Sequence, residues 1–196
     1  MVKNNIQIPS QGGGSAFRKL KITEMNRISV QQFHDVEKIP LVVVLDHVRS
    51  LYNVGSVFRT SDAFRVSEVI LCDITATPPH SEIHKTALGA EESVAWRYFK
   101  DTMEAVHALR AEGYTLLAVE QCEGSTMLNE FQVQCSMFNV PSKYAVILGN
   151  EVKGVQQSVV DACDGCLEIP QFGTKHSLNV SVTAGIVIWH FAQQLL

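Results

Sequence analysis

The residues best suited to chemistry lie in the segment LDHVRSLYNVGSVFRTSDAFRV, at the end of an apolar run. Its polar and basic members include Arg49, Asn53, Ser56, Arg59 and Arg65. We expect a helix over 53–64, and the first backbone N–H groups of a helix attract anions because they have no partner inside the helix. Gly55 and Ser56 in the first turn leave room for a ligand, and a guanidinium one turn further suits a phosphate or a developing oxyanion. The segment therefore predicts a site for a negatively charged group.

A structural interpretation of the same residues is also open. Asn53 can cap the helix, because its side-chain oxygen can accept a hydrogen bond from a free backbone N–H. Arg59 can be a surface residue that pairs with Asp62 or Glu68. Spacing alone does not decide between these alternatives.

A second group of polar residues follows the apolar run in AVILGNEVKG. Gly149 and Gly154 bracket Asn150 and Glu151, which predicts a tight bend whose backbone groups face a ligand. Glu151 can instead cap the helix that comes next. In both cases the bend begins where a buried strand ends.

The third group lies in LEIPQFGTKHSLNVSVTAG, where Pro170 ends a strand and Gly173 permits a turn. Ser177 or Asn179 is expected to cap the final helix. The two could instead surround a ligand while Leu178 packs against its apolar part. The helix that follows is apolar on nearly all sides, which predicts that it is buried, partly against another subunit.

Strands and helices alternate between these loops. Apolar runs predict strands over 40–46, 67–73, 95–99, 114–121, 143–151 and 165–170. Helical spacing predicts helices over 53–64, 102–113, 154–163 and 179–195, with one short helix within 74–94 and some helix within 125–133. This alternation predicts an α/β fold with a mainly parallel sheet and helices on both faces. Ligands of such sheets bind beyond the carboxyl ends of the strands, so the three loops outline one site.

Composition sets the number of domains. The 196 residues, 46% of them hydrophobic, can bury one core, and a second full domain is not expected. We expect a flexible leader over 1–15, containing QGGGS, and a basic extension of one or two amphipathic helices over 16–38. Its candidate buried residues are Leu20, Ile22, Met25, Ile28, Val30 and Phe33. The chain thus divides into a leader with an extension (1–39) and one folded domain (40–196).

The net charge of −4 is unevenly distributed. Residues 1–66 carry nine Lys and Arg against five Asp and Glu, whereas residues 67–196 carry seven against fifteen. A basic first third on an acidic body can be a surface for a polyanion, and chance can also produce it.

Other kinds of site have no support. The pair Cys163 and Cys166 has no second pair for zinc, so no metal site is expected. Neither glycine pattern of a phosphate loop or a dinucleotide site occurs. No apolar run is long enough for a membrane span. Five cysteines without framework spacing, and a start without the apolar stretch of a signal peptide, favour a cytoplasmic location.

Together, the three loops resemble the motifs of the SpoU/TrmH family of RNA 2′-O-ribose methyltransferases, within the SPOUT superfamily. NVGSVFRTSDAFRV resembles motif one, AVILGNEVKGV motif two and LEIPQFGTKHSLNVSVTAGIV motif three, in the same order. The resemblance covers roughly residues 40–196. It implies an α/β fold whose C-terminal part forms a trefoil knot, a known exception to the rule that chains are unknotted.

The resemblance also implies a cofactor and partners. The cofactor is S-adenosylmethionine, bound in the knot largely by main-chain groups. Its contacts here would be Glu120, Gly149, Ile169, Ser177, Leu178 and Asn179. Family members are dimers whose site is completed across the interface, and their partner is RNA, either tRNA or rRNA. The residues that would contact this RNA are Arg49, Ser56, Arg59 and Arg65, and the extension 16–38 would face it.

The catalytic residues that the resemblance implies are Arg59, Asn53, Glu151, Ser177 and Asn179. A guanidinium is essentially never deprotonated, so we expect Arg59 to stabilise the 2′-alkoxide as it forms rather than to act as the base. Two alternatives stay open: a catalytically inactive RNA-binding or assembly protein with the same fold, and a methyltransferase that acts on a base nitrogen. The presence of all five residues favours the enzyme, and the form of motif one favours the ribose.

Overall fold

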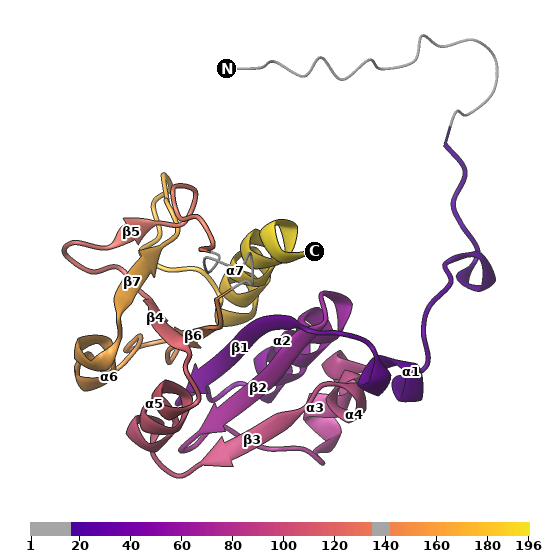
Figure 1. Cartoon of the computed structure of the whole chain (residues 1–196), viewed down its shortest axis with the longest axis horizontal. Helices are drawn as coiled ribbons and strands as arrows, with labels where there is room; N and C mark the ends of the chain where they lie inside the picture. The colour runs from indigo at the N-terminus through magenta and orange to yellow at the C-terminus, as the bar shows by residue number, and fades with distance from the viewer. Residues whose placement is uncertain (1–16, 135–141) are drawn as a thin grey trace, which may run out of the picture.

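Parallel strands form one sheet in the computed structural model, which describes residues 17–134 and 142–196. The strands are β1 (Ile39–Asp46), β2 (Val66–Cys72), β3 (Trp96–Phe99), β4 (Thr115–Val119), β5 (Thr126–Met127), β6 (Tyr144–Leu148) and β7 (Gly165–Glu168). Their order across the sheet is β3-β2-β1-β6-β4-β7-β5, so β1, β6 and β4 lie at its centre (Figure 1). The leader expected over 1–15 lies outside the described residues.

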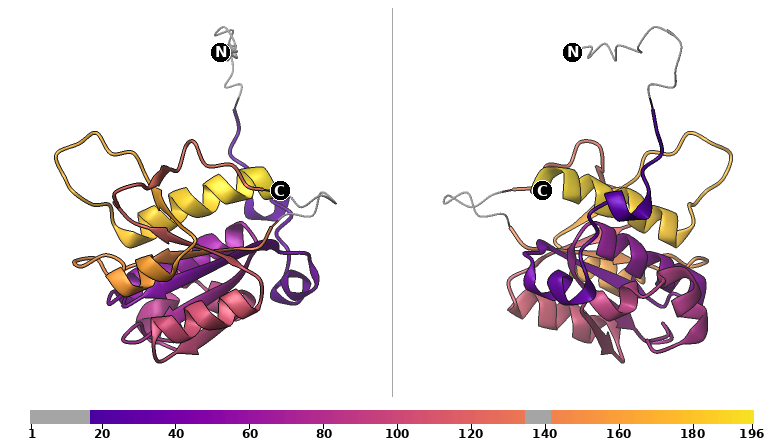
Figure 2. Two further views of the ribbon diagram at one scale, coloured as in Figure 1. Left: turned by 60° about the vertical axis from the view of Figure 1, so that its left-hand side comes forward. Right: turned by 90° about the vertical axis from the view of Figure 1, so that its right-hand side faces the viewer.

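Helices cover both faces of this sheet. They are the 3-10 helix η1 (Ile22–Glu24) and the α-helices α1 (Val30–Asp35), α2 (Leu51–Ala63), α3 (Ser81–Ala87), α4 (Ala90–Ser93), α5 (Thr102–Ala111), α6 (Gln157–Ala162) and α7 (Val180–Leu195). Leu41, Val43 and Leu45 of β1 pack with α2 and α7, whereas Val42 and Val44 pack with α5 and α6. Figure 2 shows α7 and α5 on opposite sides of the sheet. The expected α/β fold is therefore confirmed.

The strands end at one edge of the sheet, which brings the three predicted loops together. Strands β1 and β6 run in register up to Leu45 and Leu148, and Val119 of β4 lies opposite Leu148. Leu167 of β7 in turn lies opposite Val119. The loops that follow β1, β6 and β7 therefore start from the same edge, as the sequence predicts for a ligand site.

Helix α2 begins two residues before its expected start. Its cap is Ser50, whose hydroxyl accepts a hydrogen bond from the backbone N–H of Asn53 at 3.3 Å. The prediction that Asn53 caps this helix is therefore wrong, and its side chain is available to other partners. Gly55 lies in the second turn, where a Cβ would be 2.2 Å from the carbonyl oxygen of Ile83 in α3. Close packing of two helices, and not ligand access, requires this glycine.

Helix α7 packs on α2 and on the sheet. Its buried residues are Val180, Ala184, Val187, Ile188, Phe191 and Ala192. The opposite side is apolar and exposed, with Val182, Ile186 and Trp189 50%, 37% and 54% accessible. Trp189 also contacts Phe64, at the end of α2, with ring centroids 5.5 Å apart. Across residues 17–134 and 142–196, no helix is long and apolar enough to cross a membrane.

The N-terminal extension differs from its prediction. It contains one turn of 3-10 helix and the short helix α1 in place of amphipathic helices. Of its expected buried residues, Phe33 is buried, but the others are exposed: Leu20, Ile22, Met25, Ile28 and Val30. The first part of the extension projects away from the sheet, so it has no described surface to pack against (Figure 1).

Two other segments also differ in detail. Residues 74–94 contain two short helices, α3 and α4, because Leu88 and Gly89 both adopt left-handed backbone angles (φ 53° and 92°) that end the first helix. Residues 125–133, where some helix was expected, form the short strand β5 and turns. Strand β5 pairs with β7, and this tertiary pairing outweighs local helical spacing.

Candidate active site

A cavity of about 340 Å³ lies beyond the carboxyl ends of β4, β6 and β7. Six of the residues predicted to bind or act there line it: Glu120, Gly149, Glu151, Ile169, Ser177 and Leu178. Asn53 and Asn179 lie beside it, because Asn53 contacts the lining residue Glu151 and Asn179 contacts Asn53. The four residues predicted to contact RNA are not part of its lining: Arg49, Ser56, Arg59 and Arg65.

The turn after β6 forms one wall of the cavity. The backbone N–H of Asn150 donates to the Gly154 carbonyl at 3.1 Å, and the N–H of Gly154 donates back at 2.9 Å. Gly149 has no room for a side chain, because a Cβ would lie 2.1 Å from the backbone nitrogen of Val155. The expected tight bend is therefore confirmed, and Gly149 is required by a close approach of the backbone to itself.

Glu120 joins this turn to the end of β4. One carboxylate oxygen accepts a hydrogen bond from the Val155 N–H at 3.1 Å, and the other accepts one from the Gln121 N–H at 2.8 Å. A Cβ on Gly154 would collide with the carboxylate of Glu120, so this position also needs glycine. Glu120 therefore presents a fixed negative charge to the cavity.

Asn53, Glu151 and Asn179 form a hydrogen-bonded row beside the cavity. The side-chain N–H of Asn53 donates to Glu151 at 3.0 Å, and the side-chain N–H of Asn179 donates to the Asn53 oxygen at 3.2 Å. Helix α6 begins at Gln157, so Glu151 does not cap it and that alternative is wrong. Each member of the row comes from a different one of the three predicted loops.

The surroundings of Glu151 act on its pKa in opposite directions. Partial burial raises the pKa of the carboxyl. Hydrogen bonds from its own backbone, from the Asn53 side chain and from the backbone of Arg49 and Ser50 lower it. The hydrogen bonds prevail, so the pKa lies below the ordinary value of 4.5 and Glu151 is ionised at neutral pH.

Asn179 caps α7, which is one of the two roles that the sequence left open. Its side-chain oxygen accepts from the backbone N–H groups of Ser181 at 2.9 Å and Val182 at 3.4 Å, so it caps α7. Its side-chain nitrogen faces Asn53. Ser177 and Leu178 are exposed at the cavity, and neither caps the helix.

Arg59 lies apart from this cavity. It is about 9 Å further along α2 than Asn53 and on a different side of the helix, from the rise and turn of an α-helix. It lines a second groove, of about 840 Å³, between α2, α4 and residues 25–30 of the extension. The alternative in which Arg59 pairs with Asp62 or Glu68 is wrong, since Asp62 accepts from Ser93 and Glu68 pairs with Arg97. Arg65 lines the same groove, past the far end of α2.

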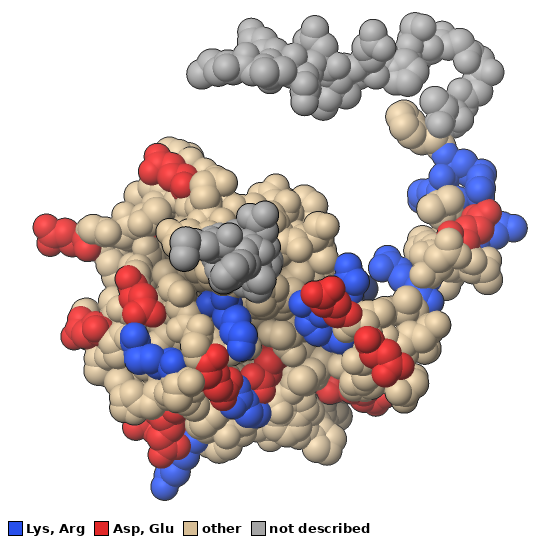
Figure 3. Space-filling model, in the orientation of Figure 1, with Lys and Arg blue, Asp and Glu red and all other residues tan. Residues whose placement is uncertain are grey.

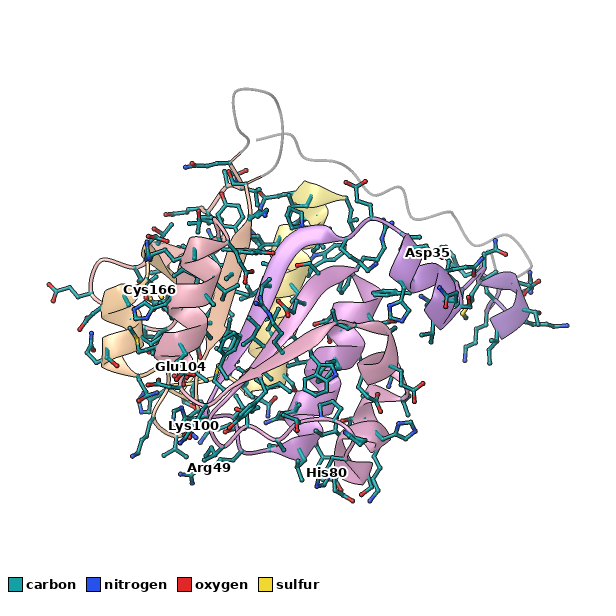
Figure 4. All side chains as sticks on the ribbon, turned by 60° about the horizontal axis from the view of Figure 1, so that its bottom comes forward. Asp35, Arg49, His80, Lys100, Glu104 and Cys166 are labelled. Carbon is teal, nitrogen blue, oxygen red and sulfur yellow. The ribbon has the colours of Figure 1, made fainter. Side chains whose placement is uncertain are left out.

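The seven arginines fall into two groups. Three of them form ion pairs with carboxylates: Arg18, Arg97 and Arg110. The guanidinium groups of the other four have no hydrogen bond or ion pair with any residue in the described ranges: Arg27, Arg49, Arg59 and Arg65. Figure 4 shows Arg49 at the edge of the molecule where the strands end. Figure 3 shows further Lys and Arg side chains on the projecting part of the extension.

Sequence reasoning missed two residues of these sites. The side chain of Gln121 donates to the backbone carbonyl of His176 at 3.1 Å, and so connects two loops that line the cavity. Arg27 lines the groove with Arg59. Neither has a local signal, because each depends on a contact between distant segments. Within the described ranges no group of His, Cys, Asp and Glu is arranged to hold a metal, and Cys163 and Cys166 are free thiols.

Residues 40–189 match the sequence profile described as the SpoU rRNA Methylase family. The chain belongs to this family. A SpoU-family relative, the 23S rRNA (guanosine-2′-O-)-methyltransferase RlmB of Neisseria meningitidis, is 30% identical over 76% of this chain and 56% of its own length. The tRNA (guanosine(18)-2′-O)-methyltransferase of Thermus thermophilus is 29% identical over 89% of this chain and 85% of its own length. The chain therefore spans little more than half of the Neisseria relative.

Solved structures of RNA-modifying enzymes share the fold. An rRNA methyltransferase from Sinorhizobium meliloti, crystallised with bound AdoMet, superposes with a TM-score of 0.73 at 25% identity, over 84% of this chain and 60% of that one. A TrmH/SpoU tRNA-modifying enzyme from A. aeolicus superposes with a TM-score of 0.72 at 21% identity, over 84% and 81% of the two chains.

Proposed function

We propose that this SpoU-family chain is an S-adenosylmethionine-dependent RNA methyltransferase that acts on a ribose 2′-hydroxyl of tRNA or rRNA. The observation that carries the proposal is the row Asn179–Asn53–Glu151, which joins all three loops beside one cavity. The names of the Neisseria and Thermus relatives describe 2′-O-methylation of guanosine in 23S rRNA and in tRNA.

The residues that line the cavity match S-adenosylmethionine in polarity and charge. Leu167, Ile169 and Leu178 offer apolar surface suited to the adenine ring, and backbone groups of the turn after β6 offer hydrogen bonds. The carboxylates of Glu120 and Glu151 suit a ligand with a positively charged sulfonium. When bound, this cofactor supplies an electrophilic methyl group, and the task of the protein is to bind and orient it.

We propose that RNA binds along the surface that carries the four unpaired arginines. Arg27, Arg59 and Arg65 face one groove, and Arg49 follows β1 at the edge of the sheet. Guanidinium groups without a carboxylate partner are available for phosphates, to which they can bind in a bidentate manner. The hydroxyl of Ser56 donates to the Tyr52 carbonyl at 2.8 Å, so Ser56 can contribute an acceptor to RNA, or a donor if that bond breaks.

Arg59 is proposed as the residue that stabilises the forming 2′-alkoxide and holds the neighbouring phosphate. Asn53 and Glu151 arrange the pocket, while Ser177 and Asn179 form its side nearest α7. Because Arg59 faces the groove and not the cavity, we propose that it acts on a ribose bound to the cavity of a second copy of the chain. The exposed apolar side of α7, next to α2, supports a dimer of this kind.

The finer points of architecture are also proposals. A C-terminal trefoil knot is supported by the strand order, in which the chain returns to insert β6 between β1 and β4, and then packs α7 back onto α2. The division into an extension (1–39) and a catalytic domain (40–196) is supported by the family profile, which begins at residue 40. The cytoplasmic location stays a prediction.

Methylation of RNA in vitro tests the proposed function. The chain is incubated with labelled S-adenosylmethionine and either tRNA or rRNA, and the RNA is then digested and analysed by mass spectrometry. We expect 2′-O-methylated nucleosides, and base-methylated products would support the base-nitrogen alternative. Calorimetry with S-adenosylmethionine identifies the inactive RNA-binding alternative, which predicts no cofactor binding.

A further inference from the structure

A buried carboxylate at the end of β1 holds the C-terminal end of the turn after β6, residues 150–156, which forms a wall of the cavity. Asp46 is fully buried, and one of its oxygens accepts a hydrogen bond from the backbone N–H of Gln156 at 3.2 Å. Its other oxygen accepts from the Gln156 side chain at 3.2 Å and from the hydroxyl of Thr102, at the start of α5, at 2.6 Å. The turn 150–156 is thus attached to the sheet where it enters α6.

The next residue, His47, holds the N-terminal end of the same turn. His47 adopts a left-handed backbone conformation (φ 57°), and its carbonyl oxygen accepts a hydrogen bond from the Asn150 side chain at 2.8 Å. The side-chain oxygen of Asn150 accepts in turn from the N–H groups of Val152 and Lys153. The His47 ring contacts Asp46 at 2.6 Å and Asp73 at 2.5 Å, which fixes its orientation.

We infer that Asp46 and His47 are positioning residues that set the shape of the turn 150–156, and that cofactor affinity depends on them. Neither residue lines the cavity, but the turn they hold contributes Asn150, Glu151 and Gly154 to its wall. Four donors contact the buried carboxylate of Asp46: the Gln156 backbone, the Gln156 side chain, the Thr102 hydroxyl and the His47 ring. The carboxylate holds these partners firmly, because each broken hydrogen bond leaves a buried charge without a partner. The link to cofactor affinity rests on the proposed function.

Thr102 provides a matched control, because it contacts the same carboxylate from a different element. Gln156→Leu removes a hydrogen bond between Asp46 and the turn, whereas Thr102→Val removes one between Asp46 and α5. A merely structural role for Asp46 predicts that both changes lower thermal stability and that neither affects the turn selectively. A positioning role predicts that only the changes at Gln156 and Asp46 alter the turn.

Two measurements on the full chain decide the inference. Amide hydrogen exchange without cofactor is expected to be at least about tenfold faster over residues 150–156 in Gln156→Leu, and unchanged there in Thr102→Val. Calorimetry is expected to give an S-adenosylmethionine Kd raised about tenfold in Gln156→Leu and Asp46→Asn, and changed less than about twofold in Thr102→Val. Gln156 is exposed, so its variant should fold even if Asp46→Asn does not.

The outcomes separate this inference from the proposed function. Unchanged exchange over 150–156 in Gln156→Leu overturns the inference, and so does a Kd within about twofold of the wild type. If the wild-type chain binds no S-adenosylmethionine, the proposed function fails, and the dependence of cofactor affinity fails with it. The exchange measurement alone then decides whether Asp46 positions the turn.

Discussion

The side-chain amide of Asn53 donates a hydrogen bond to the carboxylate of Glu151 at 3.0 Å, although 98 residues separate the two in the sequence. Asn179 contacts Asn53 from the opposite side, 126 residues away. Asn53 is thus the one member of the row that contacts both others. A change at Asn53 should therefore disturb the side-chain contacts of Glu151 and Asn179 together, although Asn53 itself does not line the cavity.

Asn53→Ala should separate catalysis from cofactor binding. The variant leaves Glu151 without its side-chain donor, so we expect methyl transfer to fall at least about 100-fold, the size of effect produced by misplacing a catalytic group by about 1 Å. The affinity for S-adenosylmethionine should change less than about threefold, since Asn53 contacts the side chain of Glu151 and takes no part in the hydrogen bonds that hold the turn 150–156. Single-turnover methylation and calorimetry measure the two quantities. A variant with normal turnover would contradict the role given to Asn53.

The same substitution should change the pKa of Glu151. Burial raises this pKa and hydrogen bonds, including the one from Asn53, lower it to below 4.5. Asn53→Ala removes one lowering contribution, so the pKa should rise. Because the folded-state pKa is depressed, ionised Glu151 stabilises the fold above its unfolded pKa, and this stabilisation disappears as the pH falls through the folded pKa. Titration of the carboxyl carbon by NMR measures the shift, and identical pKa values in both proteins would contradict it.

Much of the fold and of the site was predictable, because both follow from strands that end at one edge. Parallel strands with buried faces are recognisable as continuous apolar runs, and polar loops after three of them must then meet. Six residues that were predicted on this basis and by resemblance line one cavity: Glu120, Gly149, Glu151, Ile169, Ser177 and Leu178. The cap at Asn179 was predictable from its residue type, directly before an apolar helix.

The remaining differences depend on contacts between distant segments. Ser50 and Asn53 are both good caps, and local sequence does not show which of them starts α2. Gly55 was expected at a ligand, but it is required by α3, which lies nearly thirty residues away in the sequence. The exposed apolar residues of the extension match a helical pattern, yet that pattern shows only what could be buried and not whether a surface is present to bury it.

Gly149→Ala should prevent the turn after β6 from closing. Its Cβ would lie 2.1 Å from backbone atoms of Gly154 and Val155, which cannot move without opening the turn. We expect S-adenosylmethionine binding to weaken at least about tenfold, with a loss of stability of about 1–3 kcal/mol from overpacking. Calorimetry and thermal unfolding measure these effects. Gly173→Ala is the control, because a Cβ there meets no atom within 4 Å, and equal effects of both changes would contradict the steric argument.

The groove arginines should determine how RNA binding depends on salt. Arg27→Gln and Arg65→Gln each remove an unpaired guanidinium from the groove, so each should weaken RNA binding and reduce the slope of log K against log salt concentration by about one. Arg110→Gln removes the same charge from α5, where Arg110 pairs with Asp164, and should leave the slope unchanged. Filter binding over a range of salt concentrations measures the slopes. Equal slopes for all three variants would exclude the groove as the RNA site.

Mixing two inactive variants should restore activity if the site is shared between two copies. Arg59→Ala removes the guanidinium, and Gly149→Ala weakens cofactor binding, so each homodimer should have little activity at a limiting concentration of S-adenosylmethionine. In a mixed dimer, the intact cavity of the Arg59→Ala copy faces the intact Arg59 of the Gly149→Ala copy. Random pairing should then recover about a quarter of wild-type methylation, because half of the dimers are mixed and each has one complete site. No recovery would show that Arg59 acts within its own chain.

Ile186→Glu places a charge on the exposed side of α7. This variant should abolish the dimer, which sedimentation measures, and with it the recovery of activity.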